Sequence, residues 1–143
     1  MSTVKYVSKR VVQRSDSEDL LRNIQSDRLA RYCFHAHEDA ELHVMLIALA
    51  GNREYPIHRH TDTDEVLVIV EGEITLQFYD DRGRPDITHK LTASENISII
   101  IDIHRWHSVR AGGSGASFLE VKRGPFVQNA VQYMSPVEVV ISD

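Results

Sequence analysis

The alternation of apolar and polar stretches predicts short β-strands along most of this chain. After residue 42, candidate strands of five to seven residues, each with apolar positions, recur at close spacing, at 44–50, 65–70, 73–79, 87–91, 97–101, 107–111 and 117–122. Residues that favour turns separate them, as at Gly51-Asn52 and in the glycine-rich stretch 112–115. Strands at this spacing are typical of an antiparallel sandwich or barrel. The expected fold class is therefore all-β.

The segment 65–70 is the clearest of these strands. After Glu65 it is apolar and rich in β-branched residues, which indicates a strand buried on both faces. Glu71-Gly72 follows, and the apolar pattern resumes at residue 73. We therefore expect 65–70 and 73–79 to form a hairpin about Glu71-Gly72.

The first 41 residues follow a different pattern. Ser15 and Glu18 have the spacing of a capping box, and apolar residues follow at helical spacing, so we predict a short helix over 16–25. Residues 5–13 alternate weakly, which is compatible with an edge strand or with an arm donated to a neighbouring subunit. The sequence leaves both open.

Length and composition favour a single domain without a second folded unit. The 143 residues contain no repeat or linker, so we expect an N-terminal arm and helix over 1–41, a barrel over 42–126 and a tail over 127–143. Residues 137–141 are a candidate edge strand within that tail. One cysteine, Cys33, excludes an internal disulfide and fits a reducing compartment.

Charge and hydropathy narrow the expected partners. The chain carries 16 basic and 21 acidic residues, a net charge of −5, with no basic cluster. Nucleic acids and anionic membranes are therefore not expected as partners. Neither a signal sequence nor an apolar run long enough to span a bilayer is present, so we expect a soluble, cytoplasmic protein.

A possible metal site precedes the buried strand. His58 and His60 are two residues apart, so on an extended segment their imidazoles face the same side, and a short turn brings Glu65 towards them. Imidazoles with one carboxylate suit a divalent transition metal better than Mg or Ca.

Two further histidines compete for a fourth position in this site. His107 opens a predicted strand, whereas His104 lies in the preceding turn, so we prefer His107. A ligand from another strand would fix the geometry that one loop cannot.

A rival ligand set lies upstream of the first one. His35, His37 and Glu41 repeat the pattern of two histidines followed by a glutamate. Ala48 stands where a glycine corresponding to Gly72 would fall, which makes this set the weaker candidate.

The ligand pattern resembles that of the cupin superfamily. His58-x-His60, Glu65 and Gly72 match the first cupin motif, and Trp106-His107 resembles the second. The resemblance implies a double-stranded β-helix, also called a jelly-roll barrel, around one metal ion.

A narrower resemblance links residues 26–138 to the WbuC-type cupin metalloproteins. It is carried by Arg28-x-x-Arg31-x-Cys33-x-His35, by the segment 56–60, by Trp106-His107 and by Glu120-x-Lys122-x-Gly124-Pro125-Phe126. WbuC-type proteins are often encoded among genes for surface-polysaccharide synthesis, so the resemblance implies that context.

Four protein ligands leave two open positions on an octahedral Fe, Mn or Ni ion, which suits catalysis. A tetrahedral Zn site with the same four ligands would be closed and structural.

Glu120 is the candidate general base or partner of the ligands, and Lys122 shares its strand face. Trp106 is expected to pack against the ligand segment, and Cys33 to be a small core residue.

The expected substrate is small and anionic, such as a sugar phosphate or nucleotide sugar. Arg28, Arg31, Arg59 and Lys122 are the candidates for binding it. We expect an isomerase or epimerase type of reaction, with an iron-dependent dioxygenase and a non-catalytic binding module as alternatives. Strand edges of an open jelly roll also predict a homodimer.

Overall fold

The structure is a computed structural model that describes residues 2–24 and 29–134. Within these ranges it contains the helix α1 (Arg14–Asn23) and the following strands: β1 (Ser2–Tyr6), β2 (Leu29–Cys33), β3 (Leu42–Leu49), β4 (Glu54–His60), β5 (Glu65–Glu71), β6 (Glu73–Tyr79), β7 (Pro85–Thr92), β8 (Ser98–Ile101), β9 (His107–Ala111), β10 (Ala116–Arg123) and β11 (Val131–Tyr133). The predicted all-β fold with a short N-terminal helix is confirmed.

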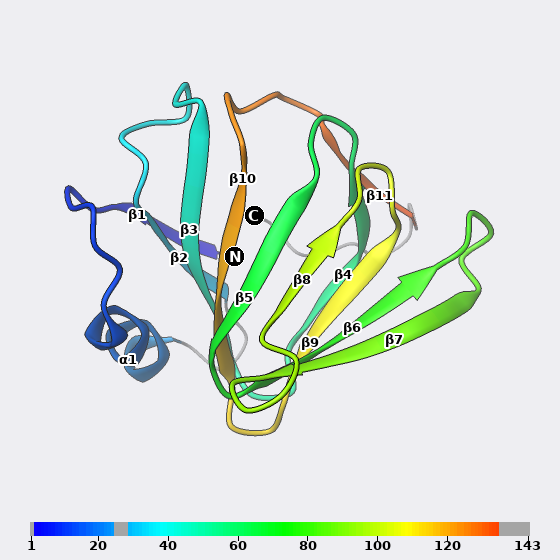
Figure 1. Cartoon of the computed structure of the whole chain (residues 1–143), viewed down its shortest axis with the longest axis horizontal. Helices are drawn as coiled ribbons and strands as arrows, with labels where there is room; N and C mark the ends of the chain where they lie inside the picture. The colour runs from blue at the N-terminus through cyan, green and yellow to red at the C-terminus, as the bar shows by residue number, and fades with distance from the viewer. Residues whose placement is uncertain (1, 25–28, 135–143) are drawn as a thin grey trace.

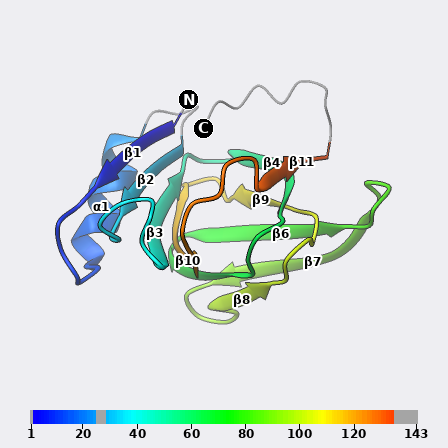
Figure 2. The same ribbon diagram turned by 90° about the horizontal axis from the view of Figure 1, so that it is seen from above.

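The strands form two sheets that enclose the interior of the molecule. One sheet has the order β1-β2-β3-β10-β5-β8, and the other has the order β11-β4-β9-β6-β7. Figure 1 shows the strands fanning out from one end, and Figure 2 shows β1, β2, β3 and β10 on one side of the molecule and β4, β6, β9 and β11 towards the other. All pairings between neighbours are antiparallel except that of β1 with β2.

The predicted hairpin about Glu71-Gly72 is wrong, although its two strands are present. β5 pairs with β10 and β8, whereas β6 pairs with β7 and β9 in the other sheet. The chain crosses between sheets at Gly72, whose φ is +72° and where an added Cβ would lie 2.3 Å from the Gly115 carbonyl oxygen. Only glycine fits this crossing without strain.

The core follows from the period-two alternation of the strands. Leu67 and Ile69 of β5 and Ile74, Leu76 and Phe78 of β6 point inward and are buried. Each such side chain contributes roughly 1.5–3 kcal/mol when it leaves water. This packing holds the two sheets at a fixed separation.

Helix α1 covers the outer face of β3. Leu20 packs with Phe34, Leu46 and Ala48 in a second apolar cluster. The helix begins earlier than predicted, and the expected capping box at Ser15 and Glu18 is wrong. Gln13 and Asp16 form the capping box instead, and the Asp16 carboxylate accepts a 2.7 Å hydrogen bond from the backbone nitrogen of Gln13.

Segments assigned to the arm and the tail enlarge both sheets. β1 and β2 extend the first sheet beyond β3, so residues 5 and 6 belong to an edge strand of their own chain. β11 extends the second sheet beside β4. Residues 137–141, the candidate edge strand of the tail, lie outside the described residues.

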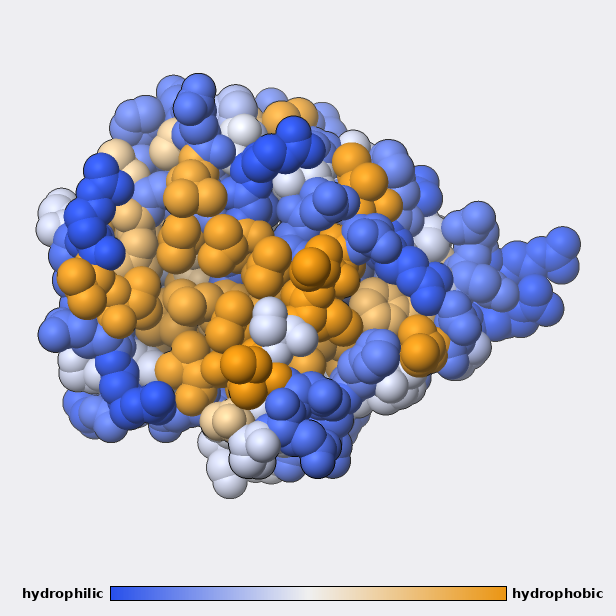
Figure 3. All heavy atoms as spheres, viewed as in Figure 1, coloured by the Kyte–Doolittle hydropathy of each residue, from blue (hydrophilic) through white to orange (hydrophobic). Residues whose placement is uncertain are grey.

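The outer face of β5, β8 and β10 carries apolar side chains. Figure 3 shows a continuous hydrophobic area over these strands. Ile100 is 68% exposed, and Val66, Val68 and Val121 are half-buried. The homodimer expected from the sequence stays a prediction. No described helix has the length and apolar character needed to cross a membrane.

Ser17 anchors the helix through a buried polar network, and its removal should destabilise the fold. Its hydroxyl donates to Glu71 Oε1 at 2.6 Å and lies 2.5 Å from Ser117 Oγ, and both serines are fully buried. Ser17→Ala leaves these partners without a hydrogen bond, so we expect the free energy of unfolding to fall by about 1–3 kcal/mol in urea titrations. Ser15→Ala, on the exposed side of α1, is the control and should change it by less than about 0.5 kcal/mol. Equal effects of the two substitutions would contradict this account.

Candidate metal centre

Two neighbouring strands bring three histidines together inside the barrel. His58 and His60 lie two residues apart on β4, so both side chains point inward, and both are buried. His107 begins β9 and lies directly opposite His58 in the antiparallel register. One ring nitrogen from each of the three lies within 4.8 Å of the others. This spacing is compatible with a single shared ion.

Glu65 reaches the same point from the opposite sheet. It is the first residue of β5, and its side chain is only 2% exposed. Glu65 Oε2 lies 2.5 Å from His60 Nε2, and Glu65 Oε1 lies 3.9 Å from His107 Nε2. The structure thus brings together His58, His60, Glu65 and His107.

Backbone hydrogen bonds orient two of the imidazoles. His58 Nδ1 lies 2.8 Å from the Pro56 carbonyl oxygen, and His107 Nδ1 lies 2.8 Å from the Arg105 carbonyl oxygen. A carbonyl only accepts, so each Nδ1 carries the proton and donates. Both Nε2 atoms are therefore left with a lone pair, as in metal-ligating histidines.

The unpaired atoms at this point fit a cation. In the described part of the chain, His107 Nε2 and Glu65 Oε2 are buried without a hydrogen-bond partner. Buried polar atoms are normally paired. A divalent metal ion at the point where these lone pairs converge would give each of them a partner.

The pKa values keep most of these four residues in the protonation state that binds a metal ion. Burial and the neighbouring His107 lower the pKa of His58 to about 3, and burial lowers the pKa of His107. Burial acts to raise the pKa of Glu65, but His60 and the other histidines outweigh it and bring that pKa to about 2. Burial acts to lower the pKa of His60, yet attraction to Glu65 raises it overall. His60 is therefore the ligand that competes with protons.

A cavity of about 440 Å³ opens beside these residues. Leu49, Val109 and Phe118 contribute apolar surface to it, whereas Arg31 and Lys122 contribute positive charge. Glu120 also lines the cavity, and burial, followed by the charge of Glu65, raises its pKa. The three ligand histidines thus face a wall that carries Arg31, Lys122 and Glu120.

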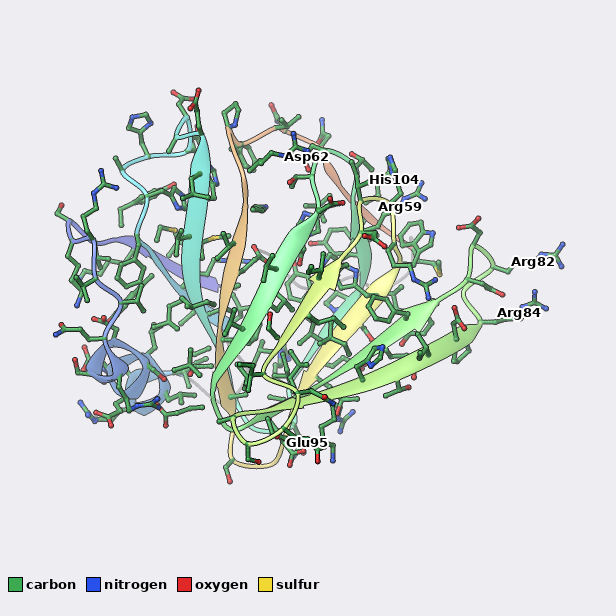
Figure 4. All side chains as sticks on the ribbon, viewed as in Figure 1. Arg59, Asp62, Arg82, Arg84, Glu95 and His104 are labelled. Atoms are coloured by element: carbon green, nitrogen blue, oxygen red, sulfur yellow. The ribbon has the colours of Figure 1, made fainter. Side chains whose placement is uncertain are left out.

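The remaining residues predicted to bind substrate are placed differently. Arg59 does not line the cavity, because it alternates with His58 and His60 on β4. Its guanidinium lies 4.4 Å from the centre of the Trp106 ring, and its Nε donates to Gln132 Oε1 at 2.8 Å. Figure 4 shows Arg59 and His104 at the outside of the molecule. Arg28 lies outside the described residues.

The rival histidines do not form a ligand set. His104 is exposed, with φ at +70°, and His37 and Glu41 are also exposed. His35 is buried, but its ring stacks on that of His43 with 4.0 Å between centroids. Among the residues that the structure describes, groups with metal-ligand spacing occur only at His58, His60 and His107 and at His60, Glu65 and Glu120.

Sequence reasoning missed three residues at the cavity. The hydroxyls of Tyr55 and Tyr133 lie 2.7 Å apart beside His58, and His43 lines the cavity near Lys122. His43 could have been found, because it shares the inward face of β3 with Met45 and Ile47. Tyr133 carried no comparable signal, since β11 lies in the segment interpreted as a tail.

Comparison with solved structures identifies the fold. Oxalate decarboxylase from Bacillus subtilis aligns with a TM-score of 0.56 and 21% identity over 66% of this chain and 24% of its own. The capsular polysaccharide assembling protein CapF from Staphylococcus aureus aligns with a TM-score of 0.61 and 14% identity, over 71% of this chain and 28% of its own. Procruciferin, an 11S globulin from Brassica napus, aligns with a TM-score of 0.55 and 16% identity, over 66% of this chain and 23% of its own. The chain matches about a quarter of the length of each.

Together with the two facing sheets, these similarities define the chain as a cupin-fold protein with a jelly-roll barrel. At the sequence level, it belongs to the family described as "Domain of unknown function (DUF6016)", whose profile matches residues 18–92. That range includes His58, His60 and Glu65 but ends before His107. A search of curated proteins found no match.

Metal binding at this site should release a proton at mildly acidic pH. The pKa of His60 is raised above its ordinary 6.5, so at pH 6.5 most metal-free molecules hold a proton there. An ion requires the neutral imidazole and must displace that proton, whereas His58, with a pKa of about 3, is already neutral and His107, whose pKa is lowered, is mostly neutral. We expect release of more than half a proton per ion at pH 6.5, falling towards zero at higher pH. Calorimetry in buffers of different ionisation enthalpy measures this number, and release that grows with pH would contradict the assignment.

Proposed function

We propose that this chain is a metal-dependent cupin that isomerises or epimerises a small, anionic, sugar-like substrate in surface-polysaccharide biosynthesis. The observation that carries the proposal is the convergence of unpaired buried atoms from Glu65 and His107 with His58 and His60 beside a cavity. A bound ion would polarise a carbonyl or hydroxyl group of the substrate. The donor set of three imidazoles and one carboxylate supports Fe, Mn, Ni or Zn rather than Mg or Ca.

The charge of the cavity supports an anionic substrate. Lys122 lies on β10 and Arg31 on β2, so both belong to the sheet that faces the histidine strands. An anionic group held there would leave the rest of a small molecule directed towards the ligand set. The apolar surface of Leu49, Val109 and Phe118 would exclude water from the remainder of the space.

The polysaccharide context rests on sequence resemblance. Arg31, Cys33, His35, Glu120 and Lys122, which resemble the WbuC-type cupins, all line the same cavity. The fold neighbour CapF is a capsular polysaccharide assembling protein, but at 14% identity its similarity to this chain concerns the fold alone. Proteins that bind the same class of substrate need similar residues around it, so the position of these five residues supports the proposed context.

Metal content is the first test of this proposal. We expect the wild-type protein to bind about one divalent ion per chain, and His60→Ala and His107→Ala to lose stoichiometric binding, because each removes an inward-facing ligand. His104→Ala is the matched control, since this histidine is exposed three residues from His107. Elemental analysis after metal loading checks all four proteins. Undiminished metal in both ligand variants would refute the proposed site.

The second test concerns the substrate. Lys122→Met should weaken binding of sugar phosphates to the metal-loaded protein by about tenfold or more, because a charge-assisted hydrogen bond is worth about 1.5–3 kcal/mol. Arg123→Met, on the exposed neighbouring position, should leave that affinity within about twofold. Calorimetric titration measures both, and product analysis identifies isomerisation. Oxygen uptake during turnover would instead indicate a dioxygenase, and binding without turnover would indicate a binding module.

A further inference from the structure

Glu120 stands beside the ligand set rather than apart from it. It lies on β10, in register with Leu67 of β5 and Met45 of β3, both of which point inward. Its carboxylate lies within 4.8 Å of ligand atoms of His60 and Glu65. Two ligands on opposite sides of an ion, each about 2.1 Å from it, are about 4.2 Å apart. Glu120 therefore lies at ligand spacing from His60 and Glu65 but is not grouped in this way with His58 and His107, so direct contact with the shared ion requires its carboxylate to turn towards them.

The charges favour that contact. Glu65, which is buried, and Glu120, which is half-buried, bring two carboxylates close together, which is costly unless a cation or a proton lies between them. Within the described residues, Glu120 makes no ion pair with Lys122, its neighbour on the same strand face. Three neutral imidazoles and two carboxylates would together offset the charge of a divalent ion. Lys122 would then remain as a source of positive charge in the cavity.

We propose that Glu120 is a fifth protein ligand of the divalent ion, a role that rests on the proposed metal-dependent function. The sequence-based assignment of Glu120 as a general base, or as a partner of the ligands, places it beside the ion without contact. The two roles differ in the number of protein atoms bound to the metal. On an octahedral ion, the fifth ligand leaves one position for water or substrate instead of two.

Cobalt spectroscopy separates the two roles without an activity assay. The visible absorption of Co²⁺ depends on the number and kind of its ligands, so we expect Glu120→Gln and Glu120→Leu to change the spectrum of the Co²⁺-loaded protein. We expect Co²⁺ affinity to fall by about 10–100-fold, although loss of an outer partner can have the same effect. Arg123→Met, at an exposed position of the same strand, is the control and should keep the wild-type spectrum. A wild-type spectrum in both Glu120 variants would overturn the assignment.

Thermal unfolding provides a second, independent readout. Without metal, Glu120→Gln removes the repulsion from Glu65, so its Tm should equal or exceed that of the wild type. With metal, the increase in Tm caused by Co²⁺ should be smaller than in the wild type, because one ligand is lost. A glutamate with a purely structural role would lower the Tm of the metal-free protein, and that result would count against the proposal.

The same experiment distinguishes failure of this inference from failure of the proposed function. A wild-type protein that takes up no Co²⁺ or other divalent metal would overturn the metal-dependent function and this role with it. A wild-type protein that binds Co²⁺ while the Glu120 variants keep its spectrum and its Tm increase would overturn the fifth ligand alone.

Discussion

The burial of Glu65 among histidines is the interaction on which the rest of this structure depends. A carboxylate that is 2% exposed is expensive to remove from water unless positive charge or donors surround it. The three imidazoles come from β4 and β9 in one sheet, whereas Glu65 comes from β5 in the other. The two sheets must therefore be held at a fixed separation, and the apolar core around Leu67, Ile74 and Leu76 does this.

Local backbone features complete the alignment of the site. The carbonyls of Pro56 and Arg105 hold the rings of His58 and His107, each from two residues earlier in the chain. Gly72 allows the chain to leave β5 and enter the other sheet within one residue. The ligands thus lie on strands rather than on loops, which limits how far they can drift from one point.

The asymmetry of the cavity connects this scaffold to the proposed chemistry. His58, His60 and His107 occupy one wall, while Lys122, Arg31, Glu120 and His43 occupy the other. If Glu65 and Glu120 both balance the charge of the ion, the positive charge of Lys122 remains to attract an anionic substrate. An anion site on the wall opposite the three ligand histidines would orient a small molecule between them before any bond changes.

The sequence by itself determined the features that depend on short-range periodicity: most strand segments after residue 42 and the shared face of His58 and His60. It also suggested Arg59 as a substrate-binding residue, and the structure showed that Arg59 points away from the cavity. The sequence also indicated Glu65 and His107, because a glutamate or histidine at the start of a predicted strand can be recognised from its neighbours in the sequence. Only the tertiary structure decided which strands pair, and the expected hairpin failed because a continuous apolar strand such as β5 can pair with any partner. The same long-range choices brought Tyr133 and His43 to the cavity and placed Glu120 beside His60, since residues far apart in the chain meet only when both sheets close.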